Sequence, residues 1–341
     1  MLSLKFHEPD KRTSYVAHSD ANIQSMHHYG AASLIAAPVT RKEQSMLTDR
    51  HVAEYQTKGF AVAEGLFTEQ EIGELRRVTD ELIVEASALT SPTPTFELEP
   101  SHAPEQPAVR RIEMPHRHFD FFREFVRHPA LIDSLQKLIG PDVRVHNSKI
   151  NLKPGRIGSP VEWHQDWCFY PHTNDAFLTV GVFLDDITSV NGPLLCLPGS
   201  HQGKIYDHHN PDTGYFCSAV DLDADPVNAT GAEECVGPAG TVSFHHVRTM
   251  HASGPNMSAQ ARRLLLIGYA AADAWPLLGV RNWDQYEADM VCGRSTRNPR
   301  MVALPCPVPF PMPPEAQERF SLFDNQKRAR RLLYDRPAEV N

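Results

Sequence analysis

The chain has 341 residues, with 33 lysines and arginines against 42 aspartates and glutamates, so its formal net charge is −9. This acidic balance argues against a nucleic-acid-binding protein, which needs a basic face to hold phosphates. The hydrophobic fraction of 41% and the charged fraction of 22% are typical of a globular protein. No apolar run approaches the roughly 18 residues of a membrane span, and no secretory leader is evident. We therefore expect a cytoplasmic protein with no nucleic-acid or membrane partner.

Cysteine spacing and short motifs exclude further classes. None of the six cysteines forms a CxxC pair, which disfavours zinc ribbons and thioredoxin-like chemistry. A chain of this size does not need a disulfide scaffold, and we expect reduced thiols. The sequence has no Gly-rich phosphate loop and no GxSxG motif, so nucleotide chemistry and serine hydrolysis are also disfavoured.

The N-terminal part divides into an extension and an entry module. Residues 1–45 are polar without sustained periodicity, and we expect a disordered or poorly ordered extension. The spacing then predicts a helix over 48–58 that ends at Gly59, followed by a short strand over 60–63. Thr68 and Glu71 have the spacing of a capping box, which predicts the start of a second helix. We expect residues 46–341 to form a single domain.

The centre of the chain is rich in β-forming segments. Residues 88–108 predict an irregular loop, and residues 129–139 predict a helix that starts at a proline. Short β-rich runs separated by turn signals follow, and no long helix alternates with them, so a doubly wound sheet is disfavoured. The runs favour a sandwich or jelly roll; they are 143–152, 177–184, 193–197, 240–244 and 264–270.

Two segments lie outside these runs. Residues 201–236 are polar and contain Pro and Gly, which predicts a long loop insertion of the kind that often forms a lid. A proline-rich stretch over 305–314 precedes a helix-like run over 315–334. This C-terminal part could pack on the core or form a dimer contact, so both a monomer and a homodimer remain open.

The HxD tripeptide occurs three times and suggests a metal site. On a strand, residues i and i+2 face the same side, so an imidazole and a carboxylate can bind one ion. His18 and Asp20 lie in the extension, and His118 and Asp120 lie beside an aromatic run that favours a structural role. The third motif, at 164–166, follows a Pro/Gly turn and precedes a predicted strand. We therefore prefer His164 and Asp166 as metal ligands.

Downstream residues complete this constellation. His251 lies 87 residues after His164, shortly beyond a β-rich run, and can supply a third ligand from a neighbouring strand. Two histidines and one carboxylate leave open metal positions, as non-haem Fe(II) oxygenases require. Arg262 opens the next predicted strand, and its guanidinium can bind a carboxylate in bidentate fashion. Strand alternation predicts that Arg263 points the other way.

With these residues in place, residues 47–275 resemble the phytanoyl-CoA dioxygenase family of Fe(II)/2-oxoglutarate oxygenases. The resemblance rests on motifs spread over the segment; they are Leu47-Thr48, Gly59-Phe60, Trp163-His164-Gln165-Asp166-Trp167, Asn191-Gly192-Pro193-Leu194, Leu197-Pro198-Gly199-Ser200-His201, Phe244-His245 and His251-Ala252-Ser253-Gly254-Pro255-Asn256 with Arg262.

The resemblance implies a fold, a site and a reaction. The implied fold is mainly β, a double-stranded β-helix (jelly-roll or cupin-like) with helices packed outside. The implied metal and catalytic residues are His164, Asp166 and His251 with Fe(II). Arg262 and Ser253 are implied to hold the far carboxylate of 2-oxoglutarate, and Asn151 matches a polar pocket residue. O2 is the oxidant, and ascorbate serves as reductant in vitro.

The expected reaction is hydroxylation of an unactivated C–H bond in a small or mid-sized metabolite, in natural-product tailoring or catabolism. Succinate and CO2 are the co-products, and desaturation or cyclisation stays open. Related halogenases lack the carboxylate, so Asp166 favours hydroxylation. The aromatic and polar residues around the metal motif could line a substrate pocket; they are Trp163, Trp167, Phe169, His172 and Thr173.

Other charged residues have two interpretations each. Arg110, Arg111, Lys149 and Arg248 could bind an anionic substrate or be ordinary surface charges. His245 and His246 we assign to packing and solvent. Two alternatives for the whole protein also remain: a zinc-dependent hydrolase or lyase with the same ligands, and a non-catalytic ligand-binding module. Neither alternative explains the spacing of Arg262 from His251.

Overall fold

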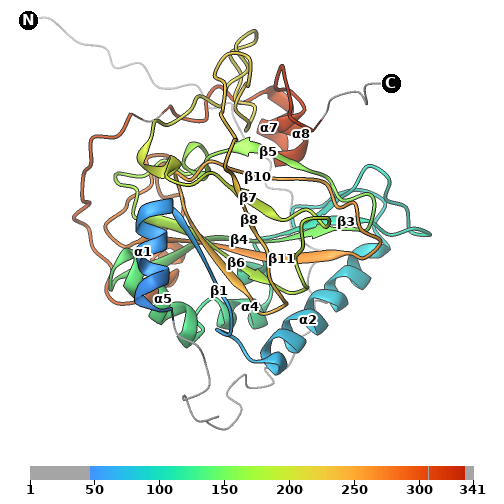
Figure 1. The fold of residues 1–341 in the computed structure, drawn as a ribbon, viewed down its shortest axis with the longest axis horizontal. Helices are drawn as coiled ribbons and strands as arrows, with labels where there is room; N and C mark the ends of the chain where they lie inside the picture. The colour runs from blue at the N-terminus through green and yellow to red at the C-terminus, as the bar shows by residue number, and fades with distance from the viewer. Residues whose placement is uncertain (1–46, 306, 335–341) are drawn as a thin grey trace, which may run out of the picture.

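The computed structural model describes residues 47–305 and 307–334. The predicted N-terminal extension, including the His18 motif, lies outside these residues. The fold is mainly β with helices, as predicted, and its strands form two sheets (Figure 1). Of the helices in the described part, none combines the length and apolar character needed to cross a membrane.

The larger sheet has the strand order β1-β9-β6-β11-β4-β3-β2, and β12 pairs with β4. All neighbours are antiparallel. Its strands are β1 (Phe60–Ala63), β2 (Phe96–Leu98), β3 (Val109–Glu113), β4 (Val143–Lys153), β6 (Phe177–Phe183), β9 (Val242–His246), β11 (Arg262–Ala271) and β12 (Met290–Cys292).

The smaller sheet has the order β5-β10-β7-β8 and faces the larger one (Figure 1). Its strands are β5 (Val161–His164), β7 (Leu194–Cys196), β8 (Glu233–Cys235) and β10 (His251–Ser253). Helices pack around the sheets; they are α1 (Asp49–Lys58), α2 (Glu69–Ser87), α3 (Pro115–His118), α4 (Asp120–Phe125), α5 (Pro129–Ile139), α6 (Trp283–Ala288), α7 (Pro314–Glu318) and α8 (Leu322–Gln326).

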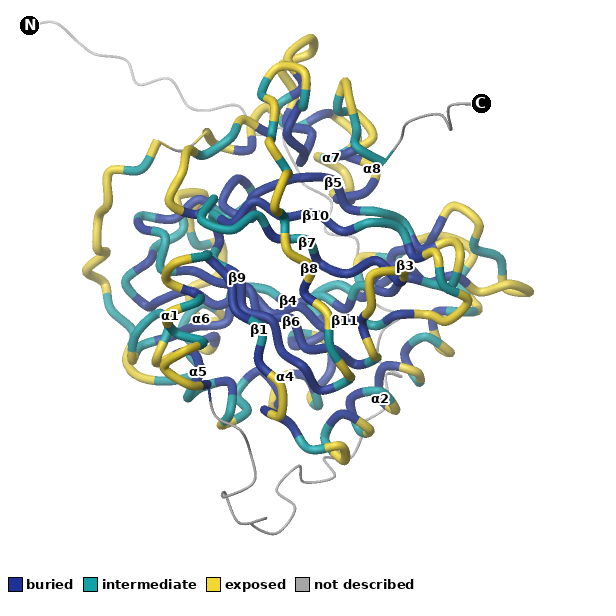
Figure 2. The backbone as a smooth tube through the Cα atoms, viewed as in Figure 1, coloured by how far each residue is buried: buried dark blue, intermediate teal, exposed yellow. Residues whose placement is uncertain are grey.

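Strand alternation separates a core face from a site face on the larger sheet. On β6, Leu178, Val180 and Val182 point into the main apolar core, which also contains Leu75 of α2 and Leu131 of α5. The strands of this core are buried, and helices cover their outer side (Figure 2). Residues of the opposite parity therefore face the smaller sheet, and this inner face carries the polar side chains of the candidate site.

Local signals in the N-terminal part act as predicted. The side chain of Thr68 accepts a hydrogen bond from the Glu71 amide, and the Glu71 side chain accepts one from the Thr68 amide, which closes the capping box of α2. Gly59 ends α1 with a φ of +85°, a conformation that favours glycine. The chain then enters β1 directly, at the edge of the larger sheet.

Three predictions of secondary structure need correction. The predicted loop over 88–108 contains β2, and the predicted insertion over 201–236 contains β8 and begins with a 3-10 turn (Ser200–Gln202). The helix-like run over 315–334 forms two short helices, α7 and α8. Strands β2 and β8 depend on hydrogen bonds to a strand elsewhere in the chain. Local sequence patterns do not predict such pairing.

Replacing Leu75 by alanine tests the packing of α2 against the sheet. Leu75 is fully buried in the main core, so its truncation should lower the free energy of unfolding by about 3 kcal/mol. Val84 on the same helix is 71% exposed, so Val84→Ala should change it by less than about 0.5 kcal/mol. Urea denaturation of both variants measures the difference, and equal effects would contradict this packing.

Candidate active site

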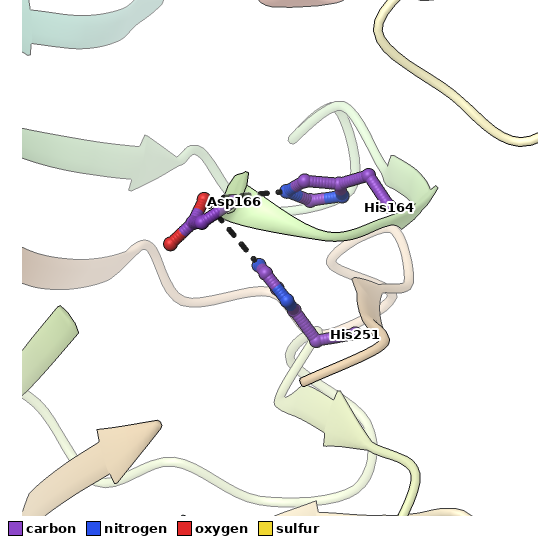
Figure 3. Close-up of side chains that lie close together, drawn as sticks. All are labelled: His164, Asp166 and His251. Atoms are coloured by element: carbon purple, nitrogen blue, oxygen red, sulfur yellow. Dashed lines mark ion pairs between the residues drawn. The ribbon is translucent and has the colours of Figure 1, made fainter. Parts of the chain in front are cut away.

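Two histidines and one aspartate converge between the sheets. His164 ends β5, Asp166 begins a 3-10 turn (Asp166–Cys168), and His251 begins β10 (Figure 3). His251 lies directly opposite His164 in the antiparallel pairing of β10 with β5. The Nε2 atoms of both imidazoles lie 3.9 Å from Oδ1 of Asp166. The sequence predicted all three residues, but Asp166 reaches the cluster from a turn and not from the strand.

Backbone carbonyls orient both imidazoles toward the centre of the cluster. Nδ1 of His164 lies 2.7 Å from the Glu162 carbonyl, and Nδ1 of His251 lies 2.8 Å from the Thr249 carbonyl. A carbonyl only accepts, so each Nδ1 carries the proton and each Nε2 presents its lone pair. Burial lowers the pKa of His164 well below its ordinary value and that of His251 to about 4, so both rings are neutral at pH 7.

This donor set fits a divalent transition metal. The three ligand atoms lie within 4.8 Å of one another and belong to buried residues. Two neutral imidazoles and one carboxylate on one side of an ion form the facial arrangement of non-haem iron oxygenases, which leaves positions open for other ligands. The structure therefore supports the metal chemistry that the sequence predicted for these residues.

A second layer holds the carboxylate of Asp166. Thr179 on β6 donates a hydrogen bond of 2.7 Å to Oδ2 of Asp166. Nε2 of His245 on β9 lies 3.4 Å from the same oxygen. Thr179 and His245 lie opposite each other in the β6–β9 pairing, so both project from the inner face of the larger sheet. The assignment of His245 to packing and solvent is thus corrected, because its ring contacts a candidate ligand.

Replacing Thr179 by valine should weaken metal binding without removing a ligand. Valine keeps the volume of threonine but cannot donate to Asp166, and loss of such a supporting hydrogen bond lowers metal affinity by about 10- to 100-fold. Serine at this position should restore most of the affinity. Titration with Fe(II) or Co(II) under anaerobic conditions measures the effect. Equal affinities for the valine variant and the wild type would contradict the role of Thr179.

The 201–236 segment forms hydrogen bonds to the turn that carries Asp166. Gln165 is buried between His164 and Asp166, and its amide donates a hydrogen bond of 3.0 Å to Nε2 of His208. Its side chain accepts from the Tyr206 amide and donates to the Lys204 and Arg248 carbonyls. This part of the insertion therefore anchors the turn that presents Asp166, a role that no local sequence pattern indicates.

A buried arginine lies in the same pocket as the three ligands. Arg262 begins β11, is 2% exposed, and donates one hydrogen bond of 2.9 Å from Nη2 to the Gly192 carbonyl. Its Nε and Nη1 atoms have no hydrogen-bond partner among the residues that the structure describes. Burial lowers the pKa of Arg262 to about 10, so the group stays charged at neutral pH. Unfilled donors on a buried cation indicate a place for an anion.

The residues around Arg262 include two that the sequence predicted and one that it missed. Ser253 and Asn151 line the same pocket, as expected. Lys153 on β4 lies opposite Arg262 on β11, and its Nζ donates to the carbonyls of Ser253 and Gly254. Burial and the nearby Arg262 lower the pKa of Lys153 well below its ordinary value. A carboxylate bound at Arg262 would offset this repulsion.

Arg263 points away from the pocket, as strand alternation predicted. Its guanidinium donates to both oxygens of Asp185 and to Asp80 of α2. Arg262 and Arg263 are thus neighbours in the sequence with opposite environments. This difference makes Arg263 a matched control for substitutions of Arg262.

A second, larger pocket meets the first at the metal cluster. Both pockets share Lys149, His164, Asp166 and Leu322. The larger pocket has a volume of about 950 Å³, and its outer wall comes from the C-terminal part of the chain, including α7 and the start of α8. The sequence left the role of this part open, and the structure places it over the candidate site (Figure 1).

Only one of the five expected substrate-pocket residues lines the larger pocket. Phe169 lines the larger pocket. Trp163 and Trp167 pack in separate buried apolar clusters, His172 packs against the ring of His146, and Thr173 hydrogen-bonds to the Trp275 amide. None of these four residues is among the residues that line the two pockets, so their role in substrate binding stays a prediction. Aromatic neighbours of a metal motif fill the core as readily as they contact a ligand.

Of the four charged residues with two interpretations each, some line the larger pocket and others do not. Arg248 donates to Asp175 and to the Gly203 carbonyl, and Arg110 lies over the ring of Phe323. Arg111 and Lys149 instead line the larger pocket beside His164 and Asp166. The surface interpretation therefore fails for Arg110 and Arg111, each of which is 3% exposed. The five described cysteines are free, in agreement with reduced thiols.

Comparison with protein families gives a match over residues 55–264 to the phytanoyl-CoA dioxygenase (PhyH) family. This range covers more than half of the chain and contains every residue of the cluster. The chain belongs to this family. A Stutzerimonas stutzeri protein named as a probable alpha-ketoglutarate-dependent hypophosphite dioxygenase is 48% identical over 261 residues, which are 76% of this chain and 91% of that protein.

Two further proteins are also similar to this chain. L-proline trans-4-hydroxylase of Streptomyces griseoviridis is 34% identical over 51% of this chain and 72% of that protein. The crystal structure of EctD from S. alaskensis with bound Fe matches with a TM-score of 0.57 and 25% identity, over 74% of this chain and 88% of that chain. The prediction of an iron- and 2-oxoglutarate-dependent dioxygenase is confirmed at the level of the family.

Proposed function

We propose that this protein is a hydroxylating dioxygenase in which His164, Asp166 and His251 hold Fe(II), while Arg262 holds the far carboxylate of 2-oxoglutarate. The observation that carries the proposal is the buried guanidinium of Arg262, which has two unfilled donors in the same pocket as the three ligands. A zinc hydrolase would have no use for this cation. A non-catalytic module would not need a ligand set that leaves metal positions open.

The residues of this chain then have distinct tasks. When bound, iron and 2-oxoglutarate activate O2 for insertion of one oxygen atom into the substrate, with succinate and CO2 as co-products. Thr179 and His245 fix the orientation of Asp166, and the carbonyls of Glu162 and Thr249 fix the imidazoles. Ser253 and Asn151 complete the polar wall around the co-substrate, and Lys153 supports it by donating to the Ser253 carbonyl. The C-terminal wall of the larger pocket limits access of water to the reacting bond.

We also propose a specific architecture, a double-stranded β-helix within a single domain. Two facing antiparallel sheets with ligands between them support a double-stranded β-helix, and residues 46–341 are proposed to act as one domain around it. Within it, the 201–236 insertion supports the metal turn through Gln165.

The substrate is proposed to be a small or mid-sized metabolite. The named substrates of the similar proteins are hypophosphite, proline and ectoine, all small molecules. Hypophosphite is the first compound to test, because the protein named for it shares 48% identity with this chain. A C–H hydroxylation of an organic metabolite is the competing reaction on the same site.

Anaerobic binding of the two cofactors tests the proposal. Addition of 2-oxoglutarate to the Fe(II)-loaded protein should produce the visible charge-transfer absorbance of an iron-chelated keto acid. His251→Ala should lose this absorbance, whereas His246→Ala, whose ring packs against Tyr55 and His201, should keep it. Retention of zinc with no response to Fe(II) and 2-oxoglutarate would instead support the hydrolase alternative.

A further inference from the structure

Two cationic side chains lie at the inner end of the larger pocket. Lys149 on β4 and Arg111 on β3 both line it next to His164 and Asp166. They come from neighbouring strands, where Arg111 lies opposite Asn151 and Lys149 lies opposite Glu113. The pair is separate from Arg262 and Lys153, which lie further along β4 and at its pairing with β11.

Both cations have donors that the described residues leave unfilled. Lys149 makes no hydrogen bond or ion pair in the part of the chain that the structure describes, although it faces Asp166, Arg111 and Glu113. Arg111 donates from Nε to Asn151 and from Nη1 to Glu113, but its buried Nη2 has no partner. Lys149 is half-buried, and its partial removal from water lowers the pKa of its ammonium. An anion placed between these donors would satisfy both groups.

Much of the remaining wall is apolar, although Glu113, Arg281 and Gln317 also line the pocket, and the pocket is too large for a small inorganic ion. Its wall includes Phe169, Tyr170, Phe310, Met312, Phe320 and Leu322. The volume of about 950 Å³ compares with about 30 Å³ for one water molecule, and hypophosphite has only three non-hydrogen atoms. A pocket of this size and lining is typical of sites for organic ligands.

The wall is held in place by contacts to the core. The Phe216 amide donates to the Pro311 carbonyl, and the Glu162 amide donates to the side chain of Gln326 in α8. Ser218 contacts Asn325 of α8 through a hydrogen bond of 2.6 Å. These bonds tie the C-terminal wall to the segments around the metal cluster, so the pocket has a defined shape.

We propose that the substrate is an organic acid whose oxyanion binds to Lys149 and Arg111 and whose apolar body lies against the C-terminal wall. The inference rests on the proposed function. Because both cations lie beside His164 and Asp166, the carbon next to the acid group is the one presented for oxidation. The balanced reaction is R–CH2–X⁻ + 2-oxoglutarate + O2 → R–CH(OH)–X⁻ + succinate + CO2, where X is a phosphonate or carboxylate group.

The test compares four probes on the Fe(II)- and 2-oxoglutarate-loaded protein: hexylphosphonate, hexanoate, hypophosphite and hexanol. Anaerobic titration follows the change that each probe causes in the charge-transfer absorbance, and aerobic succinate formation follows turnover. We expect one or both organic acids to bind and to stimulate succinate formation, with the stronger one identifying X. Hexanol should bind at least about 100-fold more weakly, because it leaves the cations without an anion.

Variants of Lys149 separate substrate binding from co-substrate binding. Lys149→Met should weaken binding of the preferred acid about 100-fold while leaving the 2-oxoglutarate absorbance unchanged, and Lys149→Arg should restore part of the affinity. Lys58→Met is the matched control, since Lys58 pairs with Glu233 on the surface.

Three results would overturn the inference. Binding of hypophosphite alone would assign the site to an inorganic ion, and loss of the 2-oxoglutarate absorbance in both Lys149 variants would assign Lys149 to the co-substrate. Equal affinities for hexanol and the acids would show that the charges of Lys149 and Arg111 do not contribute to substrate binding. Absence of the absorbance in the wild type would instead refute the proposed function itself, and with it this inference.

Discussion

Replacing Asp166 by alanine should abolish Fe(II)-dependent turnover. The variant keeps both imidazoles but loses the one anionic ligand and with it the contacts to Thr179 and His245. Loss of several kcal/mol of metal-dependent stabilisation lowers turnover to below about one thousandth of the wild-type value. The measurement is the rate of succinate formation at saturating 2-oxoglutarate, together with the dissociation constant for Fe(II).

The second HxD motif provides the control for this experiment. Asp120 is exposed and forms an ion pair with Arg123 on α4, far in the sequence from the cluster. Asp120→Ala should therefore keep wild-type turnover and metal affinity. Similar losses in the two variants would show that Asp166 has no special role as a ligand.

Replacing Arg262 by leucine should raise the KM for 2-oxoglutarate about 100-fold with a smaller effect on kcat. Removing one partner of a buried charge pair costs about 3 kcal/mol, which corresponds to that change in affinity. The guanidinium has two unfilled donors in the site and contacts none of the three ligands, so the metal should still bind. Steady-state kinetics with varied 2-oxoglutarate measures the effect.

Arg263→Leu is the matched control. Its guanidinium pairs with Asp185 and Asp80 on the outer face of the sheet, so the substitution should affect stability and not the KM for 2-oxoglutarate. A raised KM in the Arg263 variant, or an unchanged one in the Arg262 variant, would contradict the assignment of the co-substrate pocket.

The residues proposed to hold the metal and the co-substrate were predictable from spacing and residue type. His164, Asp166, His251 and Arg262 stand next to strand and turn signals, and their side chains suit one reaction. The alternation along β11 also predicts that Arg262 and Arg263 lie on opposite faces, as the structure shows. Alternation along a strand is a reliable local signal, because one face of each strand is buried and this fixes which residues point to it.

The supporting residues were not predictable, because their roles depend on contacts between distant segments. His245 contacts Asp166 only through the pairing of β9 with β6, and Gln165 is held by the insertion more than 35 residues later. Lys153 follows Asn151 by two positions on β4, so the shared strand face was a signal that could have found it. The C-terminal wall of the larger pocket had no signal, since it lies beyond the residues that match the family.

Succinate formation by the anaerobically prepared protein tests the central claim most directly. With Fe(II), ascorbate, 2-oxoglutarate, O2 and an accepted substrate, the wild type should form succinate, and omission of Fe(II) or replacement of His164 by alanine should stop it. Retention of succinate formation by the His164 variant, or no succinate from the wild type with every probe, would contradict the assignment of this site as an iron- and 2-oxoglutarate-dependent oxygenase centre.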